Sequence, residues 1–118
     1  MLDATKIGYL RLTPASKAPG SPATGPTKAM RNKLVKSGHV SFELGTYRRT
    51  EAGDAAIVAF DQSLTAAEIE TLRSIARGAR IGAGAPGFSK LLESRLIRIR
   101  SNLESGLTIE GETLLAAI

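Results

Sequence analysis

Two stretches of the chain place hydrophobic residues at the spacing of one helix face. They are LDATKIGYLR at 2–11 and LTAAEIETLR at 64–73, and each has a capping residue, Asp3 or Thr65, just ahead of its hydrophobic stripe. A side-chain oxygen at that point accepts from the free N–H groups of the first helical turn, and the glutamate three residues after Thr65 completes a capping box. Both stretches are therefore predicted to be helices that open a structural unit.

In two later stretches the spacing of the hydrophobic residues changes from that of a helix to that of a strand. KLVKSGHVSF at 33–42 and KLLESRLIRI at 90–99 begin with helical spacing and end with alternating hydrophobic and polar residues, which is typical of a strand with one buried face. The glycine-containing segments ELGTYRR and SNLESGL follow, and they predict a turn and a return strand. A threonine then starts the hydrophobic segments at 50–60 and 108–118, each of which is predicted to be a closing helix.

These stretches form an internal repeat. Each copy consists of three blocks: the opening helix, the helix that runs into the wing, and the closing helix. The copies are 57 residues apart in the second block (33 to 90) and 58 apart in the last (50 to 108). Three blocks that recur in the same order predict two copies of one fold, unit 1 at 1–61 and unit 2 at 62–118. The expected fold class is α+β: each unit is a helix, a loop, a helix, a two-stranded wing and a helix, and the two units are packed as a tandem pseudo-repeat.

The segments between the first and second blocks differ between the copies. Residues 12–26 hold four of the five prolines, which predicts an exposed, mobile loop without a ladder of hydrogen bonds. The other copy has GARIGAGAPG at 78–87, whose glycines match the G-x-G-x-x-G spacing of a dinucleotide-binding loop. That loop requires a buried strand ahead of it, and a helix is predicted there, so we interpret the segment as a connection.

Charge is unevenly shared between the copies. The 118-residue chain has a net charge of +5, and residues 1–60 hold nine basic and four acidic residues whereas residues 61–118 hold seven of each. A polyanion is the first partner that such a surplus indicates. The aromatic fraction of 4% is small for a protein that stacks on single-stranded bases, so double-stranded DNA is favoured.

Composition also excludes several kinds of chemistry. The chain has no cysteine and a single histidine, His39, which excludes disulfides, thiolate catalysis and a cysteine or histidine metal cluster. His39 is expected to pack half-buried, and no nucleophile has a matched base, so we expect neither an enzyme nor a cofactor or metal. No apolar run could span a bilayer, and the start does not resemble a secretory signal, which indicates a cytoplasmic protein with no membrane partner.

The candidate binding residues are basic or polar and lie in both copies. In the helix predicted at 27–37, Met30 and Leu34 are expected to face inward, which leaves a polar outer surface for phosphates and base edges. The alternatives are a solvated basic helix in unit 1 and, in unit 2, surface ion pairs with Glu93 and Glu104. The predicted contacts are Lys28, Arg31, Asn32 and Lys36 on that helix, Arg48 and Arg49 on the return strand of the first wing, and Arg98 and Arg100 on a strand of the second.

The segments LVKSGHVSFELGTYRRTEAGDAAI at 34–57 and LLESRLIRIRSNLESGLTIEGETLL at 91–115 resemble the second half of a winged helix-turn-helix domain. In bacterial members a recognition helix ends near a glycine, two strands form the wing, and a threonine opens the last helix. Arg95 stands where the first copy has Gly38. The resemblance implies a transcriptional regulator of a bacterium or a mobile element that binds double-stranded DNA. The alternative is a protein-docking, adaptor or inhibitor module that uses the same units without reading DNA.

Overall fold

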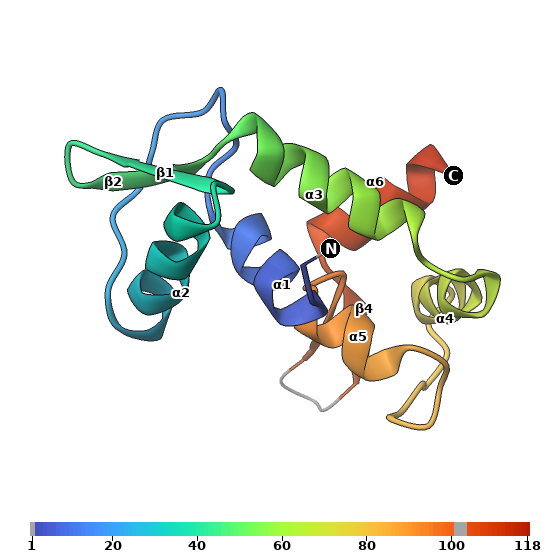
Figure 1. Cartoon of the computed structure of the whole chain (residues 1–118). Coiled ribbons are helices and arrows are strands. Elements are labelled where there is room, and N and C mark those ends of the chain that lie inside the picture. Colours follow the sequence, from blue (N-terminus) through green and yellow to red (C-terminus); the bar gives the residue numbers. More distant parts are fainter. Residues whose placement is uncertain (1, 101–103) are drawn as a thin grey trace. The chain divides into compact units, whose positions relative to one another are not determined.

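The computed structural model describes residues 2–100 and 104–118, and within them the protein is α+β. Six helices and two small antiparallel sheets of two strands each make up these residues (Figure 1). The chain divides into two compact units, Met1–Gln62 and Ser63–Ile118. None of the described helices has the length and hydrophobicity needed to cross a membrane.

Unit 1 contains the predicted elements in the predicted order. Asp3 caps the first helix, because its carboxylate accepts a hydrogen bond from the Lys6 backbone N–H at 2.8 Å. The second helix begins two residues earlier than expected, at Gly25, because Pro26 has the backbone angle of a first helical turn and needs no N–H partner there. The elements are α1 (Ala4–Leu12), α2 (Gly25–Lys36), β1 (Val40–Glu43), β2 (Thr46–Arg49) and α3 (Glu51–Gln62).

The core of unit 1 lies between its three helices and its wing. Helix α1 packs against α2 and α3, α2 packs against β1, and α3 packs against β2. An ion pair between Arg11 and Asp61 joins α1 to the end of α3. The fully or nearly buried hydrophobic side chains of this unit are Ile7, Leu10, Leu34, Val40, Tyr47 and Phe60.

Unit 2 repeats the arrangement with a shorter second helix, shorter strands and a shorter closing helix. The predicted capping box is confirmed: Thr65 Oγ1 accepts from the Glu68 N–H at 3.2 Å, and Glu68 Oε1 accepts from the Thr65 N–H at 2.9 Å. The elements are α4 (Ala66–Ala76), α5 (Phe88–Glu93), β3 (Ile97–Ile99), β4 (Ser105–Leu107) and α6 (Ile109–Ala117). The buried hydrophobic side chains are Leu64, Leu72, Ile75, Phe88, Leu91, Leu96 and Ile97.

The proline-rich loop of unit 1 is held against the wing. We call residues 13–24 the strap. Ser21 and Tyr47 exchange two backbone hydrogen bonds of 3.0 and 2.8 Å, and the Pro14 carbonyl accepts from the Arg49 N–H at 2.8 Å. The expectation of a loop without ladder bonds was therefore wrong. Proline removes its own donor but leaves every carbonyl able to accept, and its fixed backbone angle suits an extended edge.

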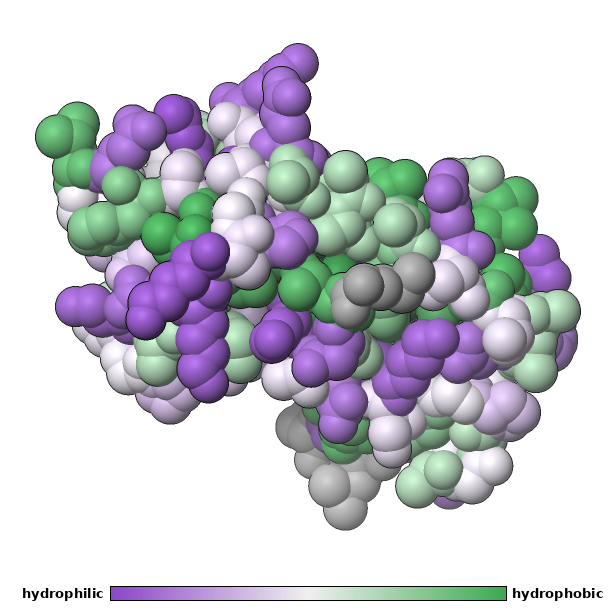
Figure 2. All heavy atoms as spheres, viewed as in Figure 1, coloured by the Kyte–Doolittle hydropathy of each residue, from purple (hydrophilic) through white to green (hydrophobic). Residues whose placement is uncertain are grey.

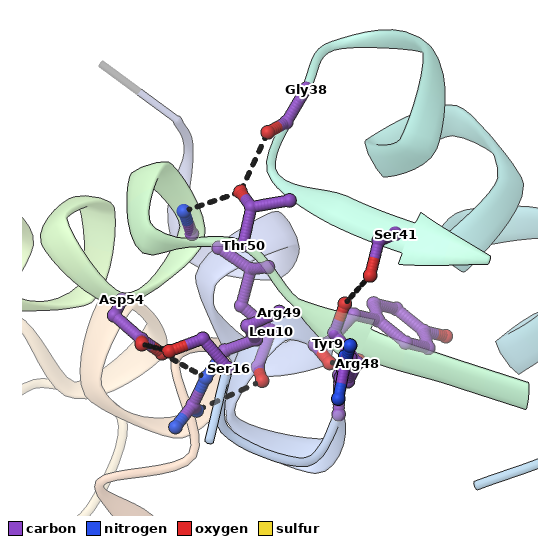
Figure 3. A network of polar contacts seen from close by, with 11 residues as sticks. Tyr9, Leu10, Ser16, Gly38, Ser41, Arg48, Arg49, Thr50 and Asp54 are labelled. Atoms are coloured by element: carbon purple, nitrogen blue, oxygen red, sulfur yellow. Dashed lines mark hydrogen bonds and ion pairs between the residues drawn. The ribbon is translucent and has the colours of Figure 1, made fainter. Parts of the chain in front are cut away.

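A corner of hydrogen bonds joins helix, strand and closing helix in unit 1 (Figure 3). The Thr50 hydroxyl donates to the Gly38 carbonyl at 2.7 Å and accepts from the Gly53 N–H at 3.2 Å. The Thr50 N–H donates to the His39 carbonyl at 3.1 Å. One threonine thus caps α3 and ties it to the end of α2.

Unit 2 builds the same corner from the matching residues. The Thr108 hydroxyl donates to the Arg95 carbonyl at 2.6 Å and accepts from the Gly111 N–H at 3.2 Å. The Thr108 N–H donates to the Leu96 carbonyl at 3.1 Å. The sequence repeat therefore extends to individual hydrogen bonds.

Both corners require a glycine inside the closing helix. A Cβ atom on Gly53 would overlap the His39 carbonyl oxygen, and one on Gly111 would overlap the Leu96 carbonyl oxygen. We expect Gly53→Ala and Gly111→Ala each to lower the free energy of unfolding by about 2 kcal/mol or more, because the corner must open. Urea denaturation measures the loss. Gly82→Ala is the matched control, since the space around Gly82 is open, and equal effects at all three positions would contradict the role of the corner.

The residue that follows the C-cap of the helix before each wing has a positive φ. It is +85° at Gly38 and +63° at Arg95, where the chain turns through the same hydrogen-bonded C-cap. Arginine is strained in this left-handed conformation, so Arg95→Gly should raise the stability of unit 2 by about 0.5–1 kcal/mol. Gly38→Arg should lower the stability of unit 1 by a similar amount. Thermal melts of both variants check the prediction, and a destabilising Arg95→Gly would overturn it.

Candidate nucleic-acid interface

Helix α2 has one solvent-exposed face that carries positive charge and no negative charge. Lys28, Lys33 and Lys36 are exposed there, and none of them forms an ion pair with a described residue. No acidic residue occurs in the helix, and hydrophilic side chains gather over α2 in Figure 2. We call this surface the basic face; its residues are Gly25, Lys28, Ala29, Asn32, Lys33 and Lys36.

Lys33 was missing from the predicted contacts, although it lies three residues before Lys36 and so on the same side of the helix. The predicted exposure is confirmed for Lys28, Asn32 and Lys36. Leu34 is buried as expected, and Met30 is half-buried. The missed signal is the helical spacing itself, which places Lys33 and Lys36 together.

Arg31 was predicted to be an exposed DNA contact, and the predicted exposure was wrong. Only 4% of the residue is exposed. Its guanidinium donates to the Leu12 carbonyl at 3.0 Å, and to the Ser21 hydroxyl and the Pro22 carbonyl at 3.1 and 3.3 Å. Arg31 lies on the helix face of Leu34, three residues away, so its long side chain runs inward and closes the strap over the unit.

The Arg31 charge is buried without a carboxylate partner among residues 2–100 and 104–118. Its guanidinium carbon lies 5.7 Å from the centre of the Tyr47 ring, and its Nε has no hydrogen-bond partner. Burial lowers the pKa of the Arg31 guanidinium, whereas Tyr47 acts in the opposite direction. Arginine stays protonated in proteins, so a positive charge lies under the basic face and is not neutralised by an ion pair.

The Asn32 side chain on the basic face is held by a buried residue. The Tyr47 hydroxyl donates to Asn32 Oδ1 at 2.6 Å, and Tyr47 is only 2% exposed. The amide oxygen is therefore directed toward the wing, and the amide nitrogen is the atom left for other partners.

The two arginines predicted on the first wing differ in what they contact. Arg48 is exposed and has no ion pair with any described residue. Arg49 Nε lies 2.8 Å from Asp54 Oδ1, and its guanidinium also donates to the Leu10 carbonyl at 3.2 Å (Figure 3). Burial would raise the pKa of Asp54, but hydrogen bonds from Ser16 and Arg49 outweigh it and leave that pKa lowered. Arg49 thus has partners within unit 1, whereas Arg48 is left exposed toward solvent.

The turn of the first wing ends in an exposed hydrophobic residue. Leu44 is 101% exposed and has a φ of +51°, a conformation that is strained for leucine. Phe42 is half-exposed beside it, and the neighbouring Glu43 is exposed. The hydrophobic end of this turn projects at the left of Figure 2.

Unit 2 lacks a counterpart of the basic face among its described residues. Lys90 on α5 lies 3.1 Å from Glu68 Oε1, and Glu68 is only 8% exposed. Arg77 and Glu70 form an exposed ion pair at 2.8 Å. Glu93 lies on the exposed side of α5 and opposes phosphate binding there.

Arg98 and Arg100 are both exposed on β3 and just after it. Neither forms an ion pair with Glu93 or Glu104 in the described part of the chain; Glu104 pairs with Arg80 at 3.3 Å. The Arg100 guanidinium lies against Gly106, where a Cβ atom would overlap it. The structure therefore leaves Arg98 the freer of the two to contact a ligand.

Two other candidates from the sequence are explained by local structure. The glycine-rich segment connects α4 to α5 with no strand before it in the described residues of unit 2, and Gly87 lies against the Glu68 side chain. His39 is half-buried, and its Nδ1 lies 2.7 Å from the Ser37 hydroxyl. Among the residues described, no cluster of histidine and acidic side chains could hold a metal.

Comparison with known proteins adds no assignment. No protein-family model matches this chain, and neither a curated protein nor a solved structure is detectably similar to it. What the chain does must therefore be argued from its own geometry.

Glu68 makes the stability of unit 2 depend on pH. Burial would raise the pKa of Glu68, but hydrogen bonds from Thr65 and the Lys90 ammonium outweigh it, so that pKa is lowered in the folded state. A carboxyl group with a lowered folded pKa stabilises the protein above its unfolded pKa, about 4.3, and this contribution is lost as the pH falls toward the folded value. Glu68→Gln should remove that part of the acid dependence in urea denaturation between about pH 3 and 7. Glu93→Gln, at an exposed residue of α5, is the control, and an unchanged pH profile in Glu68→Gln would contradict the prediction.

Proposed function

We propose that this chain is a small cytoplasmic protein that binds double-stranded DNA through unit 1, in the manner of a degenerate winged helix. Helix α2 lies in the major groove, and Arg48 on the wing contacts the neighbouring backbone. No catalytic step, metal or cofactor is part of the proposal.

The observation that carries the proposal is the basic face. Three lysines without ion pairs to the described residues surround the small residues Gly25 and Ala29 and one amide, Asn32. Long cationic side chains reach phosphates on either side of a groove, and small residues between them allow the helix backbone to approach the base edges. A merely solvated helix would commonly alternate the two signs of charge, and α2 has only one.

The element order supports the same function. Unit 1 has a helix that runs into a two-stranded wing and a threonine-capped closing helix, as the resemblance to winged helix-turn-helix domains implies. It departs from that pattern in one respect: no helix lies in residues 13–24, between α1 and α2. In the proposal the strap takes the place of that helix, because Arg31 and the Ser21–Tyr47 bridge hold α2 against the rest of the unit.

Salt dependence tests the proposal. Each phosphate that a lysine neutralises contributes about 0.9 to the slope of log affinity against log salt concentration. Replacing Lys28, Lys33 and Lys36 by Ala should lower both the affinity for a random-sequence duplex and this slope, by about 0.9 for each phosphate that the variant no longer binds. Fluorescence anisotropy with a labelled duplex, over a series of salt concentrations, measures both.

The matched control removes three positive charges elsewhere. Lys6, Lys17 and Arg73 lie outside the basic face, and their replacement by Ala changes the net charge equally. We expect a clearly smaller decrease in affinity in the control. Equal decreases in both triple variants, or no duplex binding by the parent protein at about 50 mM salt, would refute the assignment.

A protein-docking module is the second candidate, and the wing tip favours it. Leu44 is fully exposed in a strained conformation next to Phe42 and Glu43, and an acidic, hydrophobic tip fits a protein surface better than phosphate. This function takes precedence if duplex binding is absent and Leu44→Asn prevents capture of a protein partner that the parent binds.

A further inference from the structure

We infer that Asn32 is the base-reading residue of α2 and that Tyr47 selects which base it reads. The inference rests on the proposed binding of double-stranded DNA by the basic face. It assigns a preference for a base with two neighbouring hydrogen-bond acceptors in the major groove, which is guanine.

The position of Asn32 on the helix is the first step. Gly25, Ala29, Asn32 and Lys36 follow one another at intervals of four, three and four residues, so they form a stripe along the middle of the basic face. Lys28 and Lys33 flank this stripe. The flanking lysines are placed for phosphates, and Asn32 is the uncharged polar side chain placed for a base edge.

The orientation of the amide is the second step. Tyr47 is buried by the core and the strap, and its hydroxyl donates to Asn32 Oδ1 at 2.6 Å. A buried phenol whose ring is packed against Phe42 and Arg31 has little freedom to turn away. This bond holds the Asn32 amide with Oδ1 toward the wing, and the Nδ2 group presents its N–H donors outward.

Groove chemistry gives the third step. A freely rotating asparagine reads adenine with both amide atoms, accepting from N6 and donating to N7. With Oδ1 turned toward Tyr47, Asn32 presents its N–H donors to the groove. Guanine offers these donors two adjacent acceptors, N7 and O6, whereas adenine offers one acceptor, N7, beside its N6 donor.

Binding-site selection from a randomised duplex library tests the inference. The parent protein should select guanine at one position by about tenfold or more over adenine. Asn32→Ala should abolish the preference at that position alone. Tyr47→Phe should weaken it or shift it toward adenine, because the amide is free to rotate, and the salt slope should stay unchanged since the lysines of the basic face are all kept.

A second measurement does not depend on DNA. The Asn32 side-chain amide should give a rigid NMR order parameter in the parent and a clearly lower one in Tyr47→Phe. Tyr9→Phe in the same unit is the matched control for removal of a tyrosine hydroxyl, and thermal melts show whether each variant is folded.

The outcomes separate the inference from the function on which it rests. Salt-dependent binding without sequence preference, or a guanine preference that survives Tyr47→Phe in a folded protein, would overturn the inference and leave DNA binding intact. Absence of duplex binding would overturn both.

Discussion

The structure depends on one close approach, which occurs once in each unit. A backbone carbonyl just before the first strand of the wing, that of His39 or Leu96, lies so near the closing helix that only a glycine fits opposite it. The same carbonyl accepts from the threonine that caps the closing helix. Helix, strand and closing helix are therefore joined at a single point, and the directions of wing and helix within each unit follow from it.

In unit 1 a second constraint builds on that corner. The strap has too many prolines to form a helix, yet it is fixed because the buried Arg31 donates to two of its carbonyl groups and β2 pairs with its edge. Burying Arg31 turns one cation of α2 into a structural element and leaves Lys28, Lys33 and Lys36 outside. The composition of the basic face thus results from how the loop is anchored.

The two units share one backbone arrangement but differ in the charges on their surfaces. In unit 2 the corresponding helix is short, its Lys90 is engaged by the buried Glu68, and its outer side carries Glu93. Both corners have the same hydrogen bonds, so the difference lies in a few side chains outside them. The charge surplus of the first copy and the ion pairing of the second together concentrate the candidate site on α2.

The sequence by itself determined the repeat, the order of elements, the helix caps and the exposure of Lys28, Asn32 and Lys36. These depend on periodicity and on contacts between residues three or four apart, which a linear pattern records. Only the tertiary structure decided that Arg31 is buried and Arg49 ion-paired, that the strap pairs with β2, and that Tyr47 orients Asn32. The physical reason is that a long charged or polar side chain can extend into solvent or turn inward. Which of the two it does depends on the hydrogen-bond and ion-pair partners that the folded chain supplies. Those partners are residues distant in the sequence: Leu12 and Ser21 for Arg31, and Leu10 for Arg49.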